Sequence, residues 1–95
     1  MKTILVTYKA KDEETLDRFY AELIEEKIGE LSREDEGCLK YEYYLSLAKD
    51  NEILLVERWE SEEAHKLHSR TSHYAKAKEL GVKYGLEKEI IRIIE

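Results

Sequence analysis

The sequence contains no proline, four glycines and a single cysteine among its 95 residues. One cysteine, Cys38, excludes an internal disulfide and a zinc site built from cysteines, and it is typical of a reducing compartment. No apolar stretch approaches the ~20 residues of a membrane span, and the apolar run at the N-terminus is too short for a signal peptide. We therefore expect a soluble, cytoplasmic protein.

The charge distribution also lacks a basic region. No Lys/Arg cluster stands free of neighbouring Asp or Glu, and the formal net charge is −6. Binding to nucleic acid or to an anionic membrane surface needs a basic face, so neither partner is expected. With 42% apolar and 40% charged residues, the composition is that of a compact domain and not of a disordered chain. The length suits one domain over residues 1–95.

Hydrophobic periodicity in the first third of the chain predicts a strand and a long helix. Residues 3–8 alternate in the manner of a strand. Asp12 can cap the helix that follows. Its apolar residues recur at three- and four-residue spacing: Leu16, Phe19, Tyr20, Leu23, Ile24, Ile28 and Leu31. Gly29 is expected to weaken the far end by about 1 kcal/mol relative to alanine.

The rest of the chain predicts two strands, a broken helix and a last strand. Strands are expected at residues 38–47 and 53–59 around a turn at 48–52, a helix from Ser61 to about Leu80 with a break near 69–72, and a strand at 89–94. On the second strand one face is expected to carry Leu39, Tyr41, Tyr43, Leu45 and Leu47, with Cys38 on the other. The order βαββαβ predicts an α+β, ferredoxin-like fold with a four-stranded antiparallel sheet.

Two strands are apolar on both faces, which predicts a second cover for the sheet. In the last strand Ile90 and Ile94 alternate with Ile91 and Ile93, and the third strand is similar. Helices in this fold cover only one face, so the other would be expected to be polar. We expect a homodimer that packs sheet against sheet. The alternative is that loops bury the strand ends.

Three segments resemble a known family. EGCLKYEYY (36–44), ILLVERWES (53–61) and HSRTSHYAKA (68–77) stand in the order and spacing of antibiotic-biosynthesis-monooxygenase-like domains. The resemblance implies a dimeric α+β barrel similar to small quinol and polyketide oxygenases that use no metal or other cofactor. The chain departs from the family mildly, with Glu36 at a usual proline, Thr71 at a usual serine and Tyr74 at a position more often phenylalanine.

A haem-degrading branch of the same family is not expected to include this chain. That branch carries an asparagine in the first strand and a tryptophan and a histidine on the second helix. Here Thr7 and Tyr8 stand in the strand, His68 near the tryptophan position and Lys78 near the histidine position.

All three histidines fall within residues 65–74. The resemblance places His68 and His73 on the pocket side of the helix, which makes them the candidate catalytic residues. An imidazole has an unperturbed pKa of ~6.5 and suits a general base at neutral pH. His65 is expected to be solvated. His65 and His68 could share a metal ion with Glu62 or Glu63, but HExxH is absent and no metal site is expected.

Residues near the histidines in the predicted fold are candidates for the walls of a substrate pocket. Trp59 and Tyr74 are expected to shape it, and Tyr44 or Arg58 to stabilise a developing oxyanion. Glu57 shares a strand face with Trp59, so it either pairs with an Arg or Lys across the dimer or lines a cavity. Tyr41 and Tyr43 are expected in the core.

These features together favour a cofactor-independent monooxygenase. Its substrate would be a small aromatic, quinol-like or polyphenolic molecule, with a histidine as the general base. Two alternatives stay open. One is a proton-transfer isomerase acting on a small carbonyl compound. The other is a non-catalytic small-molecule-binding or stress-associated dimer, which a pocket filled by Tyr74, Leu67 and Leu80 would favour.

Overall fold

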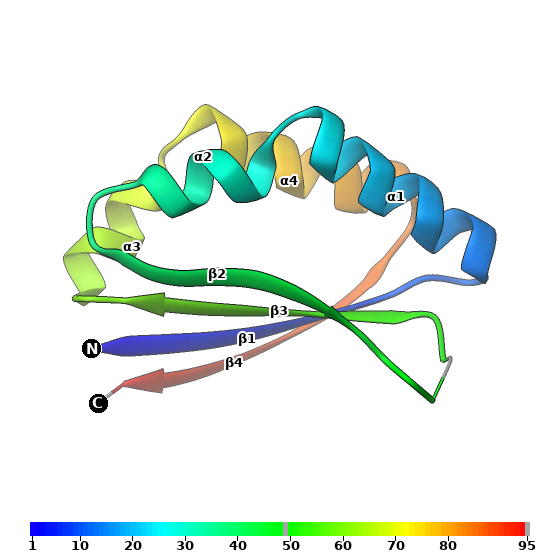
Figure 1. The fold of residues 1–95 in the computed structure, drawn as a ribbon, viewed down its shortest axis with the longest axis horizontal. Coiled ribbons are helices and arrows are strands. Elements are labelled where there is room, and N and C mark those ends of the chain that lie inside the picture. Colours follow the sequence, from blue (N-terminus) through cyan, green and yellow to red (C-terminus); the bar gives the residue numbers. More distant parts are fainter. Residues whose placement is uncertain (49, 95) are drawn as a thin grey trace.

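The computed structural model of the protein describes residues 1–48 and 50–94. Its elements are β1 (Lys2–Lys9), α1 (Glu13–Glu25), α2 (Ile28–Glu34), β2 (Cys38–Leu45), β3 (Glu52–Trp59), α3 (Glu62–His68), α4 (Ser72–Lys83) and β4 (Glu87–Ile94). The strands form one antiparallel sheet in the order β2-β3-β1-β4, and the helices lie together on one face of it (Figure 1). The predicted ferredoxin-like fold is confirmed. The predicted turn at 48–52 includes Lys49, which lies outside the described residues.

The first predicted helix is in fact two helices. Asp12 caps α1 as expected, with its Oδ1 accepting from the Thr15 N–H at 2.8 Å. The chain then breaks at Lys27, whose φ of 56° is left-handed, and Gly29 lies inside α2. The expectation that Gly29 marks the weak point is therefore wrong. The turn at Lys27 redirects the chain so that Ile28 is buried, whereas Ile24 on the preceding helix stays 58% exposed.

A bulge changes the face pattern predicted for the second strand. Cys38 pairs with Trp59 and Lys40 with Arg58, so Leu39 is an extra residue between them and is 49% exposed. A bulge shifts every preceding residue to the opposite face. Cys38 therefore lies on the same face as Tyr41 and packs against the core, contrary to the prediction. Strict alternation without a bulge assigned Leu39, and not Cys38, to the buried face.

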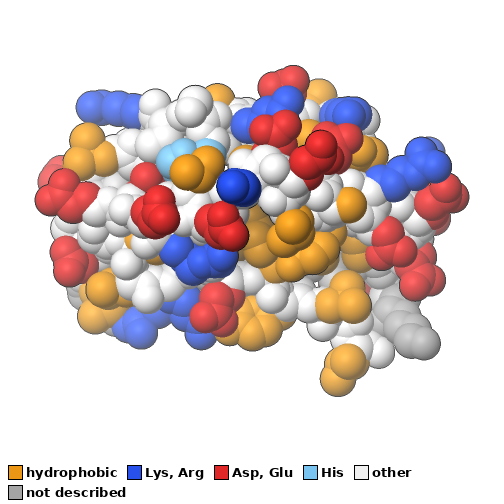
Figure 2. Space-filling view, turned by 45° about the horizontal axis from the view of Figure 1, so that its top comes forward, with side chains coloured by type: hydrophobic (Ala, Val, Ile, Leu, Met, Phe, Trp, Pro, Cys, Tyr) orange, Lys and Arg blue, Asp and Glu red, His pale blue; other side chains and the backbone are white. Residues whose placement is uncertain are grey.

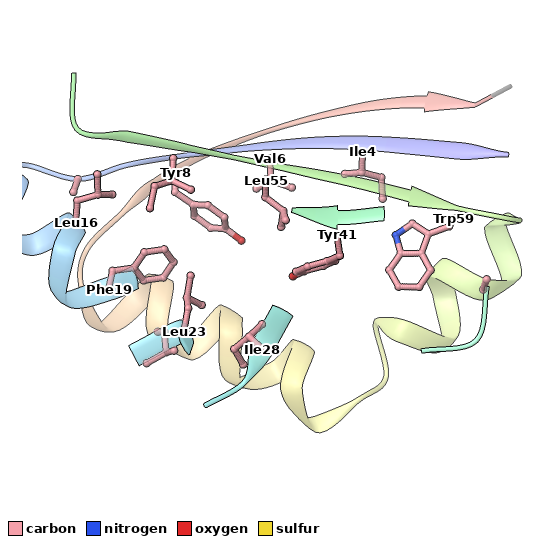
Figure 3. Packing of buried hydrophobic residues seen from close by; sticks show 14 residues of the cluster. Ile4, Val6, Tyr8, Leu16, Phe19, Leu23, Ile28, Tyr41, Leu55 and Trp59 are labelled. Atoms are coloured by element: carbon pink, nitrogen blue, oxygen red, sulfur yellow. The ribbon is translucent and has the colours of Figure 1, made fainter. Parts of the chain in front are cut away.

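The core lies between the sheet and the helices. In Figure 3 Trp59 and Tyr41 point from the strands toward the helices, and Tyr8 faces Phe19, with their ring centroids 5.3 Å apart. Trp59 and Phe19 are fully buried, and Tyr41 is buried as predicted. Burying a large apolar side chain contributes ~1.5–3 kcal/mol, so this layer supplies the main stabilisation of the fold.

The opposite face of the sheet carries an uncovered apolar patch. Leu5 stands opposite both Val56 and Ile91 in the ladder, and directly paired residues share a face. Ile93, two residues further along, lies on that same face. Ile91 is 58% exposed and Ile93 is 44% exposed.

Within residues 1–48 and 50–94 there is no helix that has both the length and the apolar character needed to cross a membrane.

Gly37 is expected to be essential for the turn that leads into β2. Its φ is +81°, and a Cβ there would lie 2.5 Å from the Cβ of Ala64. Gly37→Ala should therefore lower the free energy of unfolding by about 1–3 kcal/mol, measured by urea denaturation. Gly81→Ala is the matched control, because a Cβ at this helical position meets nothing within 4 Å. The control should raise stability by up to ~1 kcal/mol. Equal stability of the two variants would contradict this account.

Candidate functional site

His68 lies at the end of α3, where a helix break fixes its position. The Ser61 hydroxyl caps the start of α3 by accepting from the Ala64 N–H at 3.1 Å. At the break, Thr71 Oγ1 donates to the carbonyl of His68 at 2.7 Å and accepts from the Tyr74 N–H at 3.2 Å. The break predicted at residues 69–72 is confirmed by the ends of α3 and α4. It leaves the His68 side chain almost fully buried.

A single carboxylate oxygen connects the two candidate histidines. Asp35 Oδ2 lies 2.7 Å from His68 Nδ1 and 2.8 Å from His73 Nε2. Asp35 lies in the short segment between α2 and β2, so three separate parts of the chain meet here. On the face shown in Figure 2, histidine atoms reach the surface in one small area and are largely covered by their neighbours. Asp35 thus joins the two candidate histidines, and the sequence analysis had not selected this residue.

The contact with Asp35 assigns the tautomer of His68. An ionised carboxylate can only accept hydrogen bonds, so Nδ1 carries the proton and Nε2 carries the free lone pair. Burial lowers the pKa of His68 below its ordinary value, and the hydrogen bond to Asp35 opposes this in part. A neutral imidazole held in one tautomer by a carboxylate is the arrangement of a general base. Its free nitrogen, Nε2, is the atom available for chemistry.

Glu57 lies in front of that nitrogen. Its Oε1 is 4.0 Å from His68 Nε2 and accepts from the indole N–H of Trp59 at 3.1 Å. Burial raises the pKa of Glu57 to about 7, and the hydrogen bond from Trp59 opposes the shift. This carboxyl group lines a cavity, which is one of the two readings of Glu57 given above; its pairing with a cation across a dimer stays a prediction.

Aromatic rings surround the His68 imidazole. The ring centroid of Trp59 lies 4.6 Å away, that of Tyr74 5.4 Å away and that of Tyr41 5.7 Å away. Such contacts restrict the rotation of the imidazole and exclude water from it. Trp59 and Tyr74 were expected near the site, and Tyr41 was expected only as a core residue.

The space in front of His68 has a small inner part and a larger outer part. The inner part, which we call the His68 cavity, has a volume of about 40 Å³ and is lined among others by Glu57, His68 and Tyr74. That volume holds a water molecule but not a quinol. An outer groove of about 490 Å³ shares part of this lining; its walls are Tyr8, Ala77, Lys78, Gly81, Val82, Gly85, Leu86 and Lys88. The outer groove is within the usual size of ligand sites, and a substrate lying in it could extend one edge toward His68.

The sequence model of the antibiotic biosynthesis monooxygenase family matches residues 1–80. The chain belongs to this family. The protein named "Putative monooxygenase YcnE" in Bacillus subtilis (strain 168) is 36% identical over 53 residues, which are 52% of this chain and 56% of that relative. The match thus spans little more than half the length of the curated relative.

Solved structures show the same fold along the whole chain. A "putative antibiotic biosynthesis monooxygenase" from Deinococcus radiodurans superposes with a TM-score of 0.88 at 20% identity, covering 100% of this chain and 92% of that one. The protein PA3566 from Pseudomonas aeruginosa gives a TM-score of 0.82 at 21% identity, covering 99% and 92%. At such low identity these likenesses show the antibiotic biosynthesis monooxygenase fold and nothing about substrates.

Two residues expected in the pocket of this family member lie on the other face of the sheet. Tyr44 is 41% exposed and donates its hydroxyl to Glu42 Oε2 at 2.8 Å. Arg58 pairs with Thr3 and contacts Met1. Neither residue lines the His68 cavity. Arg58 follows Glu57 directly in β3, and Tyr44 pairs with Leu54, three positions from Glu57, so both side chains lie on the face opposite to Glu57. The structure therefore does not bring Tyr44 or Arg58 to His68.

His65 is not the solvated residue that was expected. It is partly buried, its ring centroid lies 5.8 Å from that of Trp59, and its Nδ1 lies 3.1 Å from Lys2 Nζ. Burial, with the charge of Lys2 as the next cause, lowers the pKa of His65 to about 4. His65 is thus a neutral wall of the His68 cavity at physiological pH.

Asp35, His68 and His73 are also the described residues that together could hold a metal ion, with ligand atoms within 4.8 Å of one another. Their oxygen–nitrogen separations are those of hydrogen bonds, 2.7 and 2.8 Å. Two ligands on a tetrahedral zinc with bonds of 2.0–2.1 Å would stand about 3.3 Å apart. The arrangement described here is therefore a hydrogen-bonded one, and a metal would have to widen it.

Sequence reasoning missed Asp35. Nothing in the spacing of residues 32–37 relates Asp35 to its two partners, which lie 33 and 38 positions later. One indication was available: Asp35 precedes the second strand, and the start of this strand lies at the same end of the sheet as the start of the broken helix. Ferredoxin-like topology brings those two loops together, so a buried histidine at the break would have a potential partner there.

Proposed function

We propose that the protein is a monooxygenase that oxygenates a small quinol-like or polyphenolic compound without a cofactor, with His68 as the general base. The observation that carries this proposal is the free Nε2 of a neutral His68, which Asp35 holds toward the cavity. Membership of the antibiotic biosynthesis monooxygenase family and the similarity to the Bacillus subtilis relative support the same reaction class.

The chemistry needs a base because dioxygen reacts slowly with a neutral, closed-shell aromatic compound. For a polyphenol whose reacting ring carbon is a CH₂ group, as in an anthrone, His68 Nε2 takes a proton from that carbon, and the resulting anion passes one electron to O₂. The two radicals combine to a peroxide at the ring carbon. His68 then returns its proton to the peroxide. Loss of water, together with removal of the second proton of the ring carbon, leaves C=O. The net change converts CH₂ and O₂ into C=O and H₂O. The substrate supplies all four electrons, so the reaction requires no external reductant.

Neighbouring residues take distinct parts in this proposal. Tyr74 lines the cavity and Trp59 packs against the His68 ring, so both help to exclude water from the base. Glu57 has a pKa of about 7, so it can hold a proton next to His68 and accept or return it during turnover. His73 bonds Asp35, packs against the His68 ring and does not line the cavity, so it acts as a positioning residue.

The direct test is oxygen uptake by chelator-treated protein with a panel of reduced quinones and anthrones. A protein-free control is essential, because quinols oxidise spontaneously. We expect uptake that exceeds the control and persists after metals have been removed. Uptake equal to the control with every compound would reject the oxygenase proposal, and uptake restored only by an added metal would reject its cofactor-free form.

The pair of proton carriers also supports a second candidate, an isomerase acting on a small carbonyl compound. His68 and Glu57, with Nε2 and Oε1 4.0 Å apart, could remove a proton from one atom and return it to another without O₂. Anaerobic exchange of substrate hydrogen with deuterium oxide would distinguish the two. Exchange with isomerised product favours the isomerase. A pocket closed by Tyr74, Leu67 and Leu80 would have favoured a binding protein, but Leu67 is 53% exposed.

We also propose that the protein is a homodimer that buries the uncovered face of the sheet, which closes the dimeric barrel. Light scattering should then give twice the chain mass of 11.3 kDa. Ile91→Lys places a charge on that face and should yield monomers. Ile94→Lys is the control, because Ile94 pairs with Lys2 on the helix side of the same strand. A wild-type monomer, or dissociation by both variants alike, would contradict this interface.

A further inference from the structure

Three cations gather along the mouth of the His68 cavity without acidic partners. Lys78 on α4 and Lys88 and Arg92 on β4 all line the cavity. In the part of the chain that the structure describes, no carboxylate lies within 4.0 Å of any of them. By contrast, Lys76 on the same helix is paired with Glu79 at 3.7 Å. A chain of net charge −6 has enough acids to pair these residues, so their arrangement points to another anion.

The acids nearest in sequence to these cations point away from them. Glu87 and Glu89 pair with Lys9 and Thr7, on the face of the sheet opposite to the helices. Among the described residues, Glu57 is the one carboxylate that lines the cavity, and the outer groove has none. Because burial raises the pKa of Glu57 to about 7, this carboxyl group is about half ionised at neutral pH and offsets only part of the charge of the three cations. The mouth of the cavity is therefore positive.

Like charges have been placed close together at this mouth. Burial lowers the pKa of Lys88, and the charge of Lys78 lowers it further. Both ammonium groups lie near aromatic rings, with Lys88 Nζ 5.7 Å from the Tyr8 centroid and Lys78 Nζ 5.8 Å from the Tyr74 centroid. Such contacts fix a cation beside an apolar wall without neutralising it. An anion bound between the two ammonium groups would relieve their repulsion.

The lining and volume of the outer groove indicate which shape of ligand it can hold. Between the two lysines its walls include the apolar side chains of Ala77, Val82 and Leu86. Gly81 contributes no side chain, and a Cβ there would meet nothing within 4 Å. The space of about 490 Å³ is thus apolar, open at one side and bounded by positive charge. This combination suits a flat ring system with one negatively charged substituent.

We propose that the groove between α4 and β4 binds an aromatic compound that carries a carboxylate, with the carboxylate between Lys78 and Lys88 and the ring directed toward His68. This inference rests on the proposed function in that it names the substrate class of the same site. It adds that the substrate is an anion before His68 removes any proton. Carboxylates and ammonium groups form charge-assisted hydrogen bonds, which supply both affinity and orientation.

A matched pair of ligands tests the proposal through binding alone. The probes are 2-naphthoate and 2-naphthamide, which share ring and shape and differ in charge. Calorimetric titration at low salt gives the two dissociation constants, and the indole N–H resonance of Trp59, the only tryptophan, reports binding at the site. We expect naphthoate to bind at least fivefold more tightly, with a preference that declines as salt is raised. The double variant Lys78→Gln/Lys88→Gln should lose the preference, and the control Lys76→Gln should keep it.

Every result decides the proposal. Equal or tighter binding of the amide, no binding of naphthoate at millimolar concentration, or a preference that persists in the double variant would overturn it. The outcome is separable from that of the oxygenase test. Charge-selective binding without any oxygen uptake would reject the proposed reaction and keep the site. Oxygen uptake that is indifferent to substrate charge and to both lysines would do the reverse.

Discussion

Replacing His68 with glutamine is expected to lower the rate of oxygen uptake by about 10²–10⁴-fold, the usual contribution of a well-placed general base. Glutamine can still donate a hydrogen bond to Asp35, so the local contacts survive while the only free imidazole nitrogen at the cavity is lost. The variant should unfold at nearly the same urea concentration as the wild type. Initial rates at saturating substrate, corrected for spontaneous oxidation, give the comparison.

The residues around His68 should rank in a defined order. Asp35→Asn should reduce the rate by about 10-fold or more, because the asparagine amide can donate an N–H to His68 Nδ1, which favours the tautomer with the proton on Nε2. His73→Gln should have the smallest effect, because the His73 side chain bonds Asp35 and does not line the cavity. Both are positioning residues, so their variants should shift the pH profile of the rate as well as its height. Glutamine at position 68 should remove the ionisation of the base from that profile.

A control and a contrary result define this prediction. Glu63→Gln changes an exposed residue of the same helix and should leave the rate unchanged. If His68→Gln keeps most of the wild-type activity, His68 is not the base. If His73→Gln is instead the most damaging change, the roles assigned to the two histidines must be exchanged.

Glu57→Gln is expected to stabilise the protein by roughly 1–3 kcal/mol at pH 8 while having little effect near pH 4. Burial raises the pKa of Glu57 from 4.5 to about 7 on folding. Glutamine has a similar shape, carries no charge and can still accept the indole N–H of Trp59. The substitution therefore removes the cost of burying a carboxylate and keeps its hydrogen bond.

The direction of this pH dependence follows from proton counts. Between pH 4.5 and about 7 the folded protein holds the Glu57 proton and the unfolded chain has lost it. The contribution of Glu57 to stability is thus highest below pH 4.5 and declines as the pH rises to about 7. Comparing the wild type with Glu57→Gln separates the contribution of Glu57 from that of His68, whose lowered pKa makes stability rise with pH. Glu60→Gln, at an exposed site, should show no such trend in urea unfolding, and a Glu57→Gln effect independent of pH would contradict the account.

The order of strands and helices could be predicted from the sequence because it depends on local patterns. Alternation in β1 and β3 and helix starts such as those at Asp12 and Ser61 act within a few residues. The errors came where a backbone irregularity intervened. The left-handed turn at Lys27 and the bulge at Leu39 leave no mark in hydrophobic periodicity, because any residue type can occupy a bulge and lysine is a poor predictor of positive φ.

The site was predictable only in part for a related reason. Family resemblance identified His68, His73 and Trp59, which lie within one short stretch of strand and broken helix. Asp35 was out of reach because its role exists only through a contact between distant loops. Tyr44 shows the converse error, since its residue type suited an oxyanion partner but its place on the strand put it on the opposite side of the sheet.

The shared carboxylate of Asp35 has a consequence for the newly made chain. Ribosomes release the N-terminal part first, so Asp35 and Glu57 emerge before His68 and His73. The partners of Asp35 lie 33 and 38 positions further along, so a nascent chain that stops short of α3 has neither base nor positioned tautomer. The proposed radical chemistry would thereby be withheld until the helices have docked on the sheet, and an incomplete translation product should be inert toward oxygen.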